Sequence, residues 1–419
     1  MKVLMLGWEF PPHLSGGLGT ACQGLSRALT GQGLELCFLL PRLHGDESSP
    51  GVSFCDVPAD SEGEAVAEIV AVASPLRPYA DRWVEPPVAK RGPLAGGYGP
   101  DLMAEVTAFA DRSAKAVEQE TFDLVHAHDW MTWPAALHLR RHRGVPFVAH
   151  VHSCEFDRNG DRGHAWIEAC EGEALASADQ VVCVSRYTAD RVAERYGVGR
   201  NRLHVIHNGV EPVPAALPRR THPGRPTILF LGRVTFQKGP RHFLEVAAHL
   251  SERLPQARFL LVGNGDLLAE MVELAADSGL ARKLFFPGFL QGEELEKVFA
   301  LADVLVLPSV SEPFGLTPLE ALQRGVPVVL SRRCGVAEAL PHCLLADPGN
   351  SADMAEKILA VLQRPGLRRF LLREGRRSLK KLTWDRAAGQ WMELYQRILN
   401  GHGGDACREA PEPYPMSPS

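Results

Sequence analysis

The sequence predicts an α/β protein built from two doubly wound, Rossmann-like domains, and three observations support this prediction. Short apolar runs alternate with helical patterns along most of the 419 residues, which is typical of parallel sheets covered by helices. A chain of this length usually divides into two or more domains. Each half also opens on an apolar strand that ends at a glycine, at residues 2–7 and 227–232.

Composition argues against several classes of function. Hydrophobic residues make up 45% of the chain and the net charge is −5 with mixed signs, which does not favour a nucleic acid or a membrane surface as partner. The nine cysteines show no C-x-x-C pattern, and this favours reduced thiols over disulfides or zinc. No apolar run approaches the ~20 residues that cross a bilayer. We therefore expect a cytoplasmic protein with no transmembrane segment.

The expected first domain covers residues 1–210. Its first strand is followed by a loop rich in proline and glycine and then by a helix, an opening that binds ligands in doubly wound folds. The loop lacks the G-x-G-x-x-G spacing of a dinucleotide site. Residues 44–100 are irregular and are expected to form an insertion that carries specificity. Further strands are expected near 123–127, 146–151, 181–184 and 203–206, with helices near 101–119, 130–142, 165–176 and 186–196.

A proline-rich stretch separates the two halves. Residues 211–225 contain four prolines and no periodicity, which predicts a linker. The expected second domain covers residues 226–383, with strands near 227–231, 257–262, 283–286, 303–307 and 326–330. The amphipathic helix at 384–400 is expected to return to the first domain, and the polar tail at 401–419 to be disordered.

The segment from Leu305 to Leu330 contains two glutamates, Glu312 and Glu320, eight positions apart around the start of a short helix. Free backbone N–H groups at a helix start bind anions. Two carboxylates beside such a site fit a diphosphate that is flanked by hydroxyl-rich groups, as in a nucleotide sugar. The alternative is a buried strand, loop and helix with two solvated glutamates.

Arg233 and Lys238 follow the first strand of the second half. The carboxyl ends of parallel strands face the ligand crevice, and the two cations suit phosphate oxygens. The alternative is a pair of surface cations without a ligand.

Polar residues also end the strands of the first half. His126 and His128 alternate along one strand and so share a face, but no third metal ligand stands out, and we expect no metal site. Asp129 is placed to cap the next helix and could also face the crevice. His152 and Asn208 end later strands, where an ordinary hydrogen-bonded histidine and a turn are the alternatives.

Five elements in order resemble the retaining GT-B glycosyltransferases of family four, close to the glycogen and starch synthases. These are the Gly16-Gly17-Leu18 loop, H-x-H-D-W at 126–130, H-N-G-V at 207–210, G-R-x(4)-K-G at 232–239, and E-x(7)-E at 312–320. The resemblance covers residues 1–400 and implies a GT-B fold, in which two Rossmann-like domains face a central cleft.

The resemblance also implies roles for single residues. Arg233 and Lys238 would neutralise the donor diphosphate, Glu320 would hold the ribose, and Glu312 would contact the donor sugar. His152 would lie beside the anomeric carbon. Further implied donor contacts are the sugar-positioning Asp129 and Asn208, the backbone of Gly17, and the amides of Phe314, Gly315, Leu316 and Thr317.

The implied reaction is transfer of a hexosyl group, expected to be glucosyl, from a nucleoside-diphosphate sugar to a saccharide or other hydroxyl acceptor. It would proceed with retention and without metal or cofactor. Leu14 and Ser15 stand where bacterial glycogen synthases have Lys and Thr, so an α-glucan product and an ADP-sugar donor stay open. The alternatives are a nucleotide-sugar epimerase, a phosphorylase, for which no pyridoxal-lysine context is found, and a non-catalytic sugar-binding module.

Overall fold

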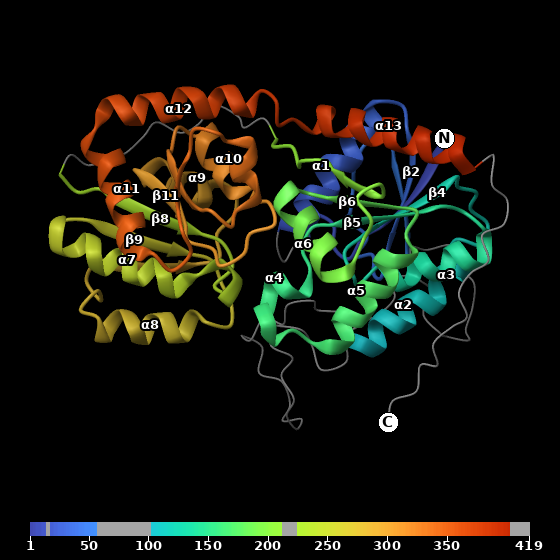
Figure 1. Cartoon of the computed structure of the whole chain (residues 1–419), viewed down its shortest axis with the longest axis horizontal. Helices are drawn as coiled ribbons and strands as arrows, with labels where there is room; N and C mark the ends of the chain where they lie inside the picture. Colours follow the sequence, from blue (N-terminus) through green and yellow to red (C-terminus); the bar gives the residue numbers. More distant parts are fainter. Residues whose placement is uncertain (14–16, 57–101, 212–223, 403–419) are drawn as a thin grey trace.

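The computed structural model describes residues 1–13, 17–56, 102–211 and 224–402. Most of the expected insertion at 44–100, nearly all of the expected linker at 211–225, and the tail after residue 402 lie outside this part of the chain. Two parallel sheets lie side by side, and each is covered by helices, as Figure 1 shows. The prediction of an α/β protein with two doubly wound domains is therefore confirmed. We call the first sheet with its helices the first domain, and the second sheet with its helices the second domain.

The first sheet has seven parallel strands in the order β3-β2-β1-β4-β5-β6-β7. Its strands are β1 (Lys2–Leu6), β2 (Glu35–Leu40), β3 (Val52–Asp56), β4 (Leu124–His128), β5 (Phe147–Val151), β6 (Gln180–Cys183) and β7 (Leu203–Val205). Val3 and Met5 belong to the apolar core on one face, whereas Leu4 and Leu6 belong to the core on the other. Because both faces are buried, strand β1 is the continuous apolar run from which it was predicted.

Helices cover both faces of the first sheet. Leu25 of α1 (Gly17–Gly31) and Trp391 of α13 (Trp384–His402) belong to the core on the face that includes Val3. The core on the other face includes residues of α2 (Leu102–Ala116), α3 (Trp133–Arg143), α5 (Ala165–Ser177) and α6 (Arg186–Tyr196). The short elements α4 (Glu155–Asn159) and η1 (Gly160–Arg162) follow β5.

The second sheet has six parallel strands in the order β10-β9-β8-β11-β12-β13, which is the strand order of dinucleotide-binding folds. Its strands are β8 (Thr227–Leu231), β9 (Arg258–Val262), β10 (Leu284–Gly288), β11 (Val304–Leu307), β12 (Val328–Ser331) and β13 (Leu344–Ala346). Its helices are α7 (Pro240–Arg253), α8 (Leu268–Asp277), α9 (Gly292–Leu301), α10 (Thr317–Gln323), α11 (Ser351–Gln363) and α12 (Pro365–Leu379), with short turns η2 (Phe236–Lys238) and η3 (Gly335–Ala339).

The last helix, α13, follows the second sheet in sequence but packs on the first. It contacts α1, and Gln32 Nε2 donates a hydrogen bond to the Asp385 carbonyl at 2.7 Å. In Figure 1, α12 and α13 run one after the other along the same side of the two sheets. Gly401 and His402, which the sequence assigned to the tail, belong to this helix.

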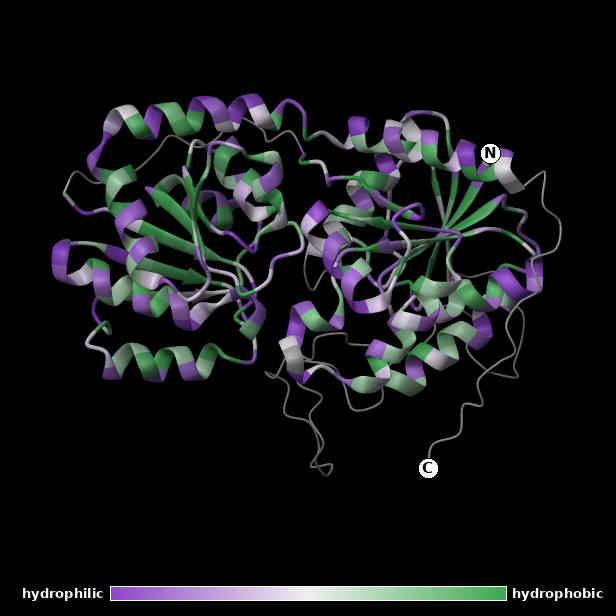
Figure 2. Cartoon of the chain, viewed as in Figure 1, coloured by the Kyte–Doolittle hydropathy of each residue, from purple (hydrophilic) through white to green (hydrophobic). Residues whose placement is uncertain are grey.

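The hydropathy of the residues follows this architecture. Strands of both sheets are hydrophobic, whereas the helices alternate hydrophobic and hydrophilic residues (Figure 2). Strands β2 and β13 are apolar runs that the sequence did not single out. Within the described residues, no helix combines the length and the hydrophobicity that a membrane crossing needs.

Replacing Gly209 with alanine should lower the melting temperature. A Cβ at this position would lie 2.2 Å from the backbone nitrogen of Trp384, so the start of α13 would have to move away from the end of the first sheet. Such overpacking typically costs about 1–3 kcal/mol. Differential scanning calorimetry of Gly209→Ala measures the shift.

The matched control is Gly389→Ala, inside α13, where the nearest atom to an added Cβ is Gln32 Oε1 at 4.0 Å. Alanine should stabilise this helix position by about 0.5–1 kcal/mol. An unchanged or raised melting temperature for Gly209→Ala would contradict the close contact between residue 209 and α13.

Candidate active site between the two sheets

Several of the predicted site residues follow strands that flank the reversal of strand order in each sheet. In the second sheet this reversal lies between β8 and β11, and in the first sheet between β1 and β4. Open α/β sheets bind ligands at such points, outside the carboxyl ends of the strands. Lys238 follows β8 and Glu312 follows β11, while Gly17 and Asp129 follow β1 and β4.

Lys238 and Glu312 are brought into direct contact. Lys238 Nζ donates to Glu312 Oε2 at 2.5 Å. Both side chains are largely buried, with 17% and 7% of their surfaces exposed. An ammonium and a carboxylate at this distance form a charge-assisted hydrogen bond. A ligand with phosphate and hydroxyl groups could separate the pair, because the phosphate would attract Lys238 and the hydroxyls would donate to Glu312.

The loop after Glu312 leads into α10, and Leu316 directly precedes this helix. Gly315 has a left-handed φ of 99°, and a Cβ at this position would lie 3.2 Å from Glu312 Cγ. Glycine is therefore needed both for the backbone conformation and for the contact. Phe314 is buried and stacks against His207 of the first domain, with 5.7 Å between ring centroids.

Glu320 lies in the first turn of α10, as the sequence predicted. Burial raises the pKa of this carboxyl, while the positive charge of Arg324 acts in the opposite direction. Arg324 Nε is itself paired with both carboxylate oxygens of Glu296 at 2.9 Å. Glu320 is thus a largely buried carboxyl one turn beyond the loop that carries Phe314 and Gly315.

Gly17 lies opposite the start of α10. A Cβ at Gly17 would be 3.8 Å from Leu316 Cδ1, so the first residue of α1 faces the loop that precedes α10. Nearby, Glu9 Oε1 accepts a hydrogen bond from the Gly19 amide at 2.9 Å. This buried carboxylate therefore fixes the first turn of α1, although no sequence pattern had singled it out.

Asp129 does not cap the following helix, and that prediction is wrong. Helix α3 begins at Trp133 and is preceded by Thr132. Asp129 has a left-handed φ of 59°, and its Oδ1 accepts hydrogen bonds from the amides of His152 at 2.6 Å and Ser153 at 3.2 Å. Its carboxylate thus holds the end of the neighbouring strand β5.

Positively charged residues of both domains affect the pKa of Asp129. Burial raises its pKa to about 6, and the positive charges of Arg158 and Arg233 limit that rise. Arg158 Nη2 lies 3.5 Å from Asp129 Oδ2. Arg233 belongs to the second domain and is half-buried, and its positive charge lowers the pKa of Asp129, which belongs to the first domain.

His152 is held by a second histidine. His128 Nδ1 lies 2.8 Å from His152 Nε2, so one ring nitrogen of His152 is engaged by the protein. The dense surroundings of His152 lower its pKa to about 3. The ring is therefore neutral at physiological pH, and only its other nitrogen remains available to a ligand.

Two further rings extend this group into a buried cluster. His126 Nε2 lies 3.0 Å from His150 Nδ1, and His126 Nδ1 lies 2.6 Å from the hydroxyl of Tyr395 on α13. Within the described residues, His128 Nε2 and His150 Nε2 have no hydrogen-bond partner. Burial lowers the pKa values of His126, His128 and His150 well below the usual range.

Spacing along the chain shows no third metal ligand beside His126 and His128, but the pairing of the strands brings a third histidine close to them. His150 lies on the adjacent strand, in register with His128, and these three residues could hold a metal ion because their ligand atoms lie within 4.8 Å of one another. A second such group is formed by His13, His44 and Glu47. In the buried group, both nitrogens of His126 already have partners.

Asn208 is less closely tied to the other predicted residues. It is buried and follows β7, the edge strand of the first sheet. In the described part of the chain, no hydrogen bond joins its side chain to Asp129, His152 or Glu312. Its neighbour His207 pairs through Nε2 with Glu338 Oε1 of the second domain at 2.6 Å.

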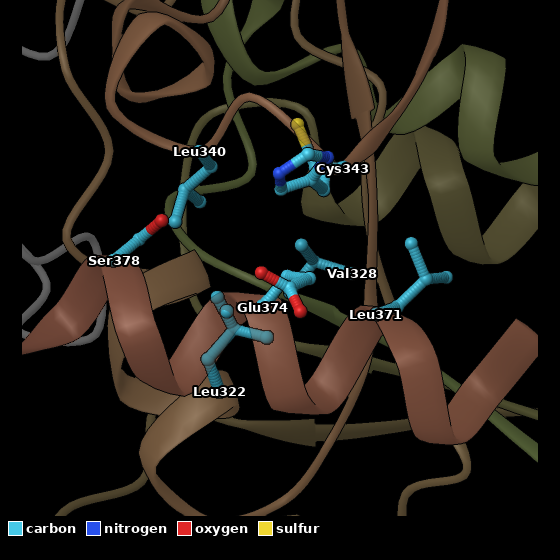
Figure 3. Close-up of a pocket in the computed structure, with 9 residues that line it drawn as sticks. Leu322, Val328, Leu340, Cys343, Leu371, Glu374 and Ser378 are labelled. Carbon is cyan, nitrogen blue, oxygen red and sulfur yellow. The ribbon is translucent and has the colours of Figure 1, made fainter.

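A small cavity in the second domain is separate from this site. Its volume is about 10 Å³, and Figure 3 shows Leu322, Leu340, Leu371 and Glu374 among the side chains around it. None of the predicted site residues lines it. A volume of this size holds at most about one water molecule, so it is a packing defect behind α10.

Sequence reasoning missed the residues that connect the domains around Glu312. They are Asp157, Ser185, Tyr187, Thr188, Arg191, Ser311 and Glu338. Their partners are more than 100 positions away in sequence, so no local spacing indicates them. The H-x-H pattern occurs in the sequence at 126–128 and again at 150–152. Which of these histidines contact one another depends on the register between β4 and β5, which the sequence does not show.

Comparisons with known proteins agree with the fold. Residues 15–213 match the family model described as Glycosyltransferase Family 4, and residues 218–378 match that described as Glycosyl transferases group 1. The chain is similar to 2-deoxystreptamine glucosyltransferase from Streptomyces kanamyceticus, with 31% identity over 304 residues, 66% of this chain and 78% of that protein. It is also similar to glycogen synthase from Mycobacterium tuberculosis strain H37Rv, with 27% identity over 424 residues and 96% of both chains.

Among solved structures, sucrose-phosphate synthase from Thermosynechococcus elongatus has a TM-score of 0.75 at 22% identity, covering 96% of this chain and 99% of that chain. The fold and the matched models define a two-domain transferase of the GT-B type. The chain belongs to the GT-B glycosyltransferases that combine a family 4 domain with a group 1 domain and are related to the glycogen synthases. The family expected from the sequence is therefore confirmed.

The buried histidines predict a loss of stability in mild acid. Their folded-state pKa values lie below the unfolded value near 6.5, so below that pH the unfolded chain binds protons that the folded chain does not. The stabilising contribution is complete above pH 6.5 and is lost as pH falls toward the folded pKa values. Each buried histidine should lower the free energy of unfolding by up to about 1.4 kcal/mol for each pH unit below 6.5.

Melting temperatures between pH 7.5 and 5 test this prediction. His126→Gln should reduce the pH dependence, because glutamine does not titrate. The control is His249→Gln on α7, where the side chain is exposed, and this variant should keep the wild-type pH dependence. Identical curves for His126→Gln and the wild type would contradict the prediction.

Proposed function

We propose that this glycosyltransferase transfers a hexosyl group, glucosyl in the first instance, from a nucleoside-diphosphate sugar to a hydroxyl acceptor with retention at the anomeric carbon. The observation that carries this proposal is the contact between Lys238 and Glu312 at the strand reversal of the second sheet. This contact places a cation that would bind the diphosphate next to a carboxylate that would bind the sugar hydroxyls.

The donor would lie mainly on the second domain. Lys238 and Arg233 would neutralise the diphosphate, and the amides of the loop from Phe314 to Thr317 would contact it or the sugar. Glu320 would accept hydrogen bonds from the ribose hydroxyls. Donor binding would separate Lys238 from Glu312, and the freed carboxylate would accept hydrogen bonds from the transferred sugar.

The first domain would supply the acceptor side. Gly17 faces Leu316, and Arg233 is close enough to Asp129 to affect its pKa, which supports a site formed from both domains. Asp129 would act by fixing the backbone of His152, whose neutral ring would contact the sugar. Asn208 is assigned to sugar positioning by family resemblance alone.

In the proposed reaction, the bond from the anomeric carbon to the diphosphate oxygen breaks, and the bond to the acceptor oxygen forms on the same face. The acceptor proton passes to the leaving phosphate oxygen. The protein stabilises the departing negative charge through Lys238 and Arg233, and Glu312 balances the positive charge that develops on the sugar. No metal ion or cofactor takes part in this scheme.

Two relatives supply the acceptor classes to be tested, a glucan and an aminocyclitol, according to their names as glycogen synthase and 2-deoxystreptamine glucosyltransferase. Thermal stabilisation by UDP-, ADP- and GDP-glucose would identify the donor, because a bound ligand raises apparent stability. Release of nucleoside diphosphate that depends on an acceptor supports transfer. Acceptor-independent conversion of the donor would instead favour an epimerase, and donor binding without turnover a non-catalytic module.

Alanine at Lys238 or Arg233 should lower kcat/KM for the donor about ten- to a hundred-fold, because each would remove a charge-assisted hydrogen bond worth about 1.5–3 kcal/mol. Steady-state kinetics with varied donor measures the effect. Lys297→Ala on α9 is the control, since Lys297 is an exposed lysine paired with Glu293 and Glu294. Near-normal kcat/KM in both site variants would rule out the diphosphate contacts.

Activity should persist in excess EDTA, and the product should keep the α configuration of the donor. Both results follow if protein cations neutralise the diphosphate and the acceptor attacks from the face that the diphosphate leaves. Proton NMR of the new anomeric centre reads the configuration. A β-linked product, or activity that EDTA abolishes and magnesium or manganese restores, defeats the scheme.

A further inference from the structure

Glu312 lies in a short stretch of chain that the first domain holds from both sides. On one side, Ser311 Oγ donates to Asp157 Oδ1 at 2.5 Å. On the other side, the Pro313 carbonyl accepts hydrogen bonds from Ser185 Oγ at 2.5 Å and Thr188 Oγ1 at 3.2 Å. Both sequence neighbours of Glu312 are therefore bonded to residues of the other domain.

The Ser311 hydroxyl is the centre of a buried network. Tyr187 Oη lies 3.0 Å from Ser311 Oγ, and Arg191 Nη1 donates to Ser311 Oγ at 3.1 Å. Arg191 also reaches Asp157 Oδ1 at 3.4 Å, so its charge balances the carboxylate. A hydroxyl has one proton to donate and two lone pairs, and these contacts use its full capacity.

The second domain fixes the backbone of Glu312 itself. The Glu312 amide donates to the Arg333 carbonyl at 2.8 Å, and the Glu312 carbonyl accepts from the Gly335 amide at 2.8 Å. A Cβ at Gly335 would lie 2.0 Å from the Pro313 oxygen and 2.5 Å from Ser185 Oγ. Glycine at 335 therefore permits Ser185 to approach Pro313.

A carboxylate of the second domain completes the contact. Glu338 Oε1 accepts a hydrogen bond from the Arg186 amide at 2.8 Å, and Glu338 Oε2 one from the Tyr187 amide at 3.3 Å. These amides belong to the first turn of α6, so Glu338 caps a helix of the other domain. Helix α6, whose residues bond Ser311 and Pro313, is therefore hydrogen-bonded at its start to the second domain.

We propose that Ser311, Asp157 and Ser185 are positioning residues for Glu312. Their contacts set the place of the Glu312 carboxylate, so that it reaches its working position against the donor sugar only when the two domains are in contact. This inference rests on the proposed function, because it takes Glu312 as the group that contacts the transferred sugar. Lys238 and Arg233, the proposed diphosphate contacts, lie on the second domain and make none of the hydrogen bonds that join Ser311 and Pro313 to the first domain.

Ser311→Ala tests the proposal, and Ser309→Ala is its matched control. Ser309 is a buried serine in the same loop, and its Oγ has no hydrogen-bond partner within the described residues. We expect Ser311→Ala to lower kcat about ten- to a hundred-fold, because small misplacements of reacting groups have effects of this size. The Kd of the nucleoside diphosphate that stabilises the wild type should change less than about twofold. Ser309→Ala should retain wild-type kcat.

Two further variants separate positioning from a general structural effect. Ser311→Thr keeps the hydroxyl and should recover most of the lost kcat. In the Glu312→Gln background, Ser311→Ala should cause little additional loss, because a residue that acts through Glu312 has no further effect once that carboxylate is gone. Ser185→Ala, which removes a bond on the Pro313 side, should repeat this pattern if Ser311→Ala does not fold.

Several outcomes would overturn the proposal: an unchanged kcat in Ser311→Ala, an equal loss in Ser309→Ala, or a loss that multiplies fully with Glu312→Gln. So would a weakened nucleoside diphosphate Kd that alone accounts for the lost activity. Wild-type turnover in the same assay decides the proposed function separately. A wild type that transfers sugar while Ser311→Ala remains normal would refute the positioning role and leave the transferase assignment intact.

Discussion

The reversal of strand order in each sheet is the constraint on which the site depends. In the second sheet, β8 and β11 are neighbours whose following connections leave in opposite directions, which opens a space outside their carboxyl ends. The salt bridge between Lys238 and Glu312 spans this reversal. The first sheet has its own reversal between β1 and β4, where Gly17 and Asp129 follow the strands. The two sets of loops approach each other because these edges of the sheets face one another.

The sequence was sufficient for features that depend on one strand or one loop. Strands buried on both faces are continuous apolar runs, so most of them and the residues at their ends could be placed without a structure. Lys238 and Glu312 follow from that rule. Asp129 is a case where this rule fails. Its preference for capping predicted a role at the start of the next helix. In the structure, the register of β4 and β5 places the amides of His152 and Ser153 beside its carboxylate, and both donate to it. A contact that depends on register between strands cannot be derived from spacing along one of them.

The same limit applies to the histidine cluster under α13. His126 lies 269 positions from Tyr395, yet their side chains share a hydrogen bond. The cluster places four neutral rings where a core would ordinarily be aliphatic, and two ring nitrogens lack partners in the described residues. Unpaired buried polar atoms cost stability. The compensating gains are the stacking of His126 on Trp391 and the anchoring of α13 to strand β4, which ends at His128. The last helix is therefore fixed on the first sheet by polar as well as apolar contacts.

The two domains contribute differently to the site. The two cations that would neutralise the diphosphate, Arg233 and Lys238, lie on the second domain and follow its first strand, β8. The place of Glu312 is set by both, because its own backbone is bonded within the second domain while its neighbours Ser311 and Pro313 are bonded to the first. A loop held only within its own domain would keep the same geometry whether or not the acceptor side was present. Because both domains hold this loop, the orientation of the Glu312 carboxylate depends on the contact between the domains. The same contact assembles a site that needs groups from both.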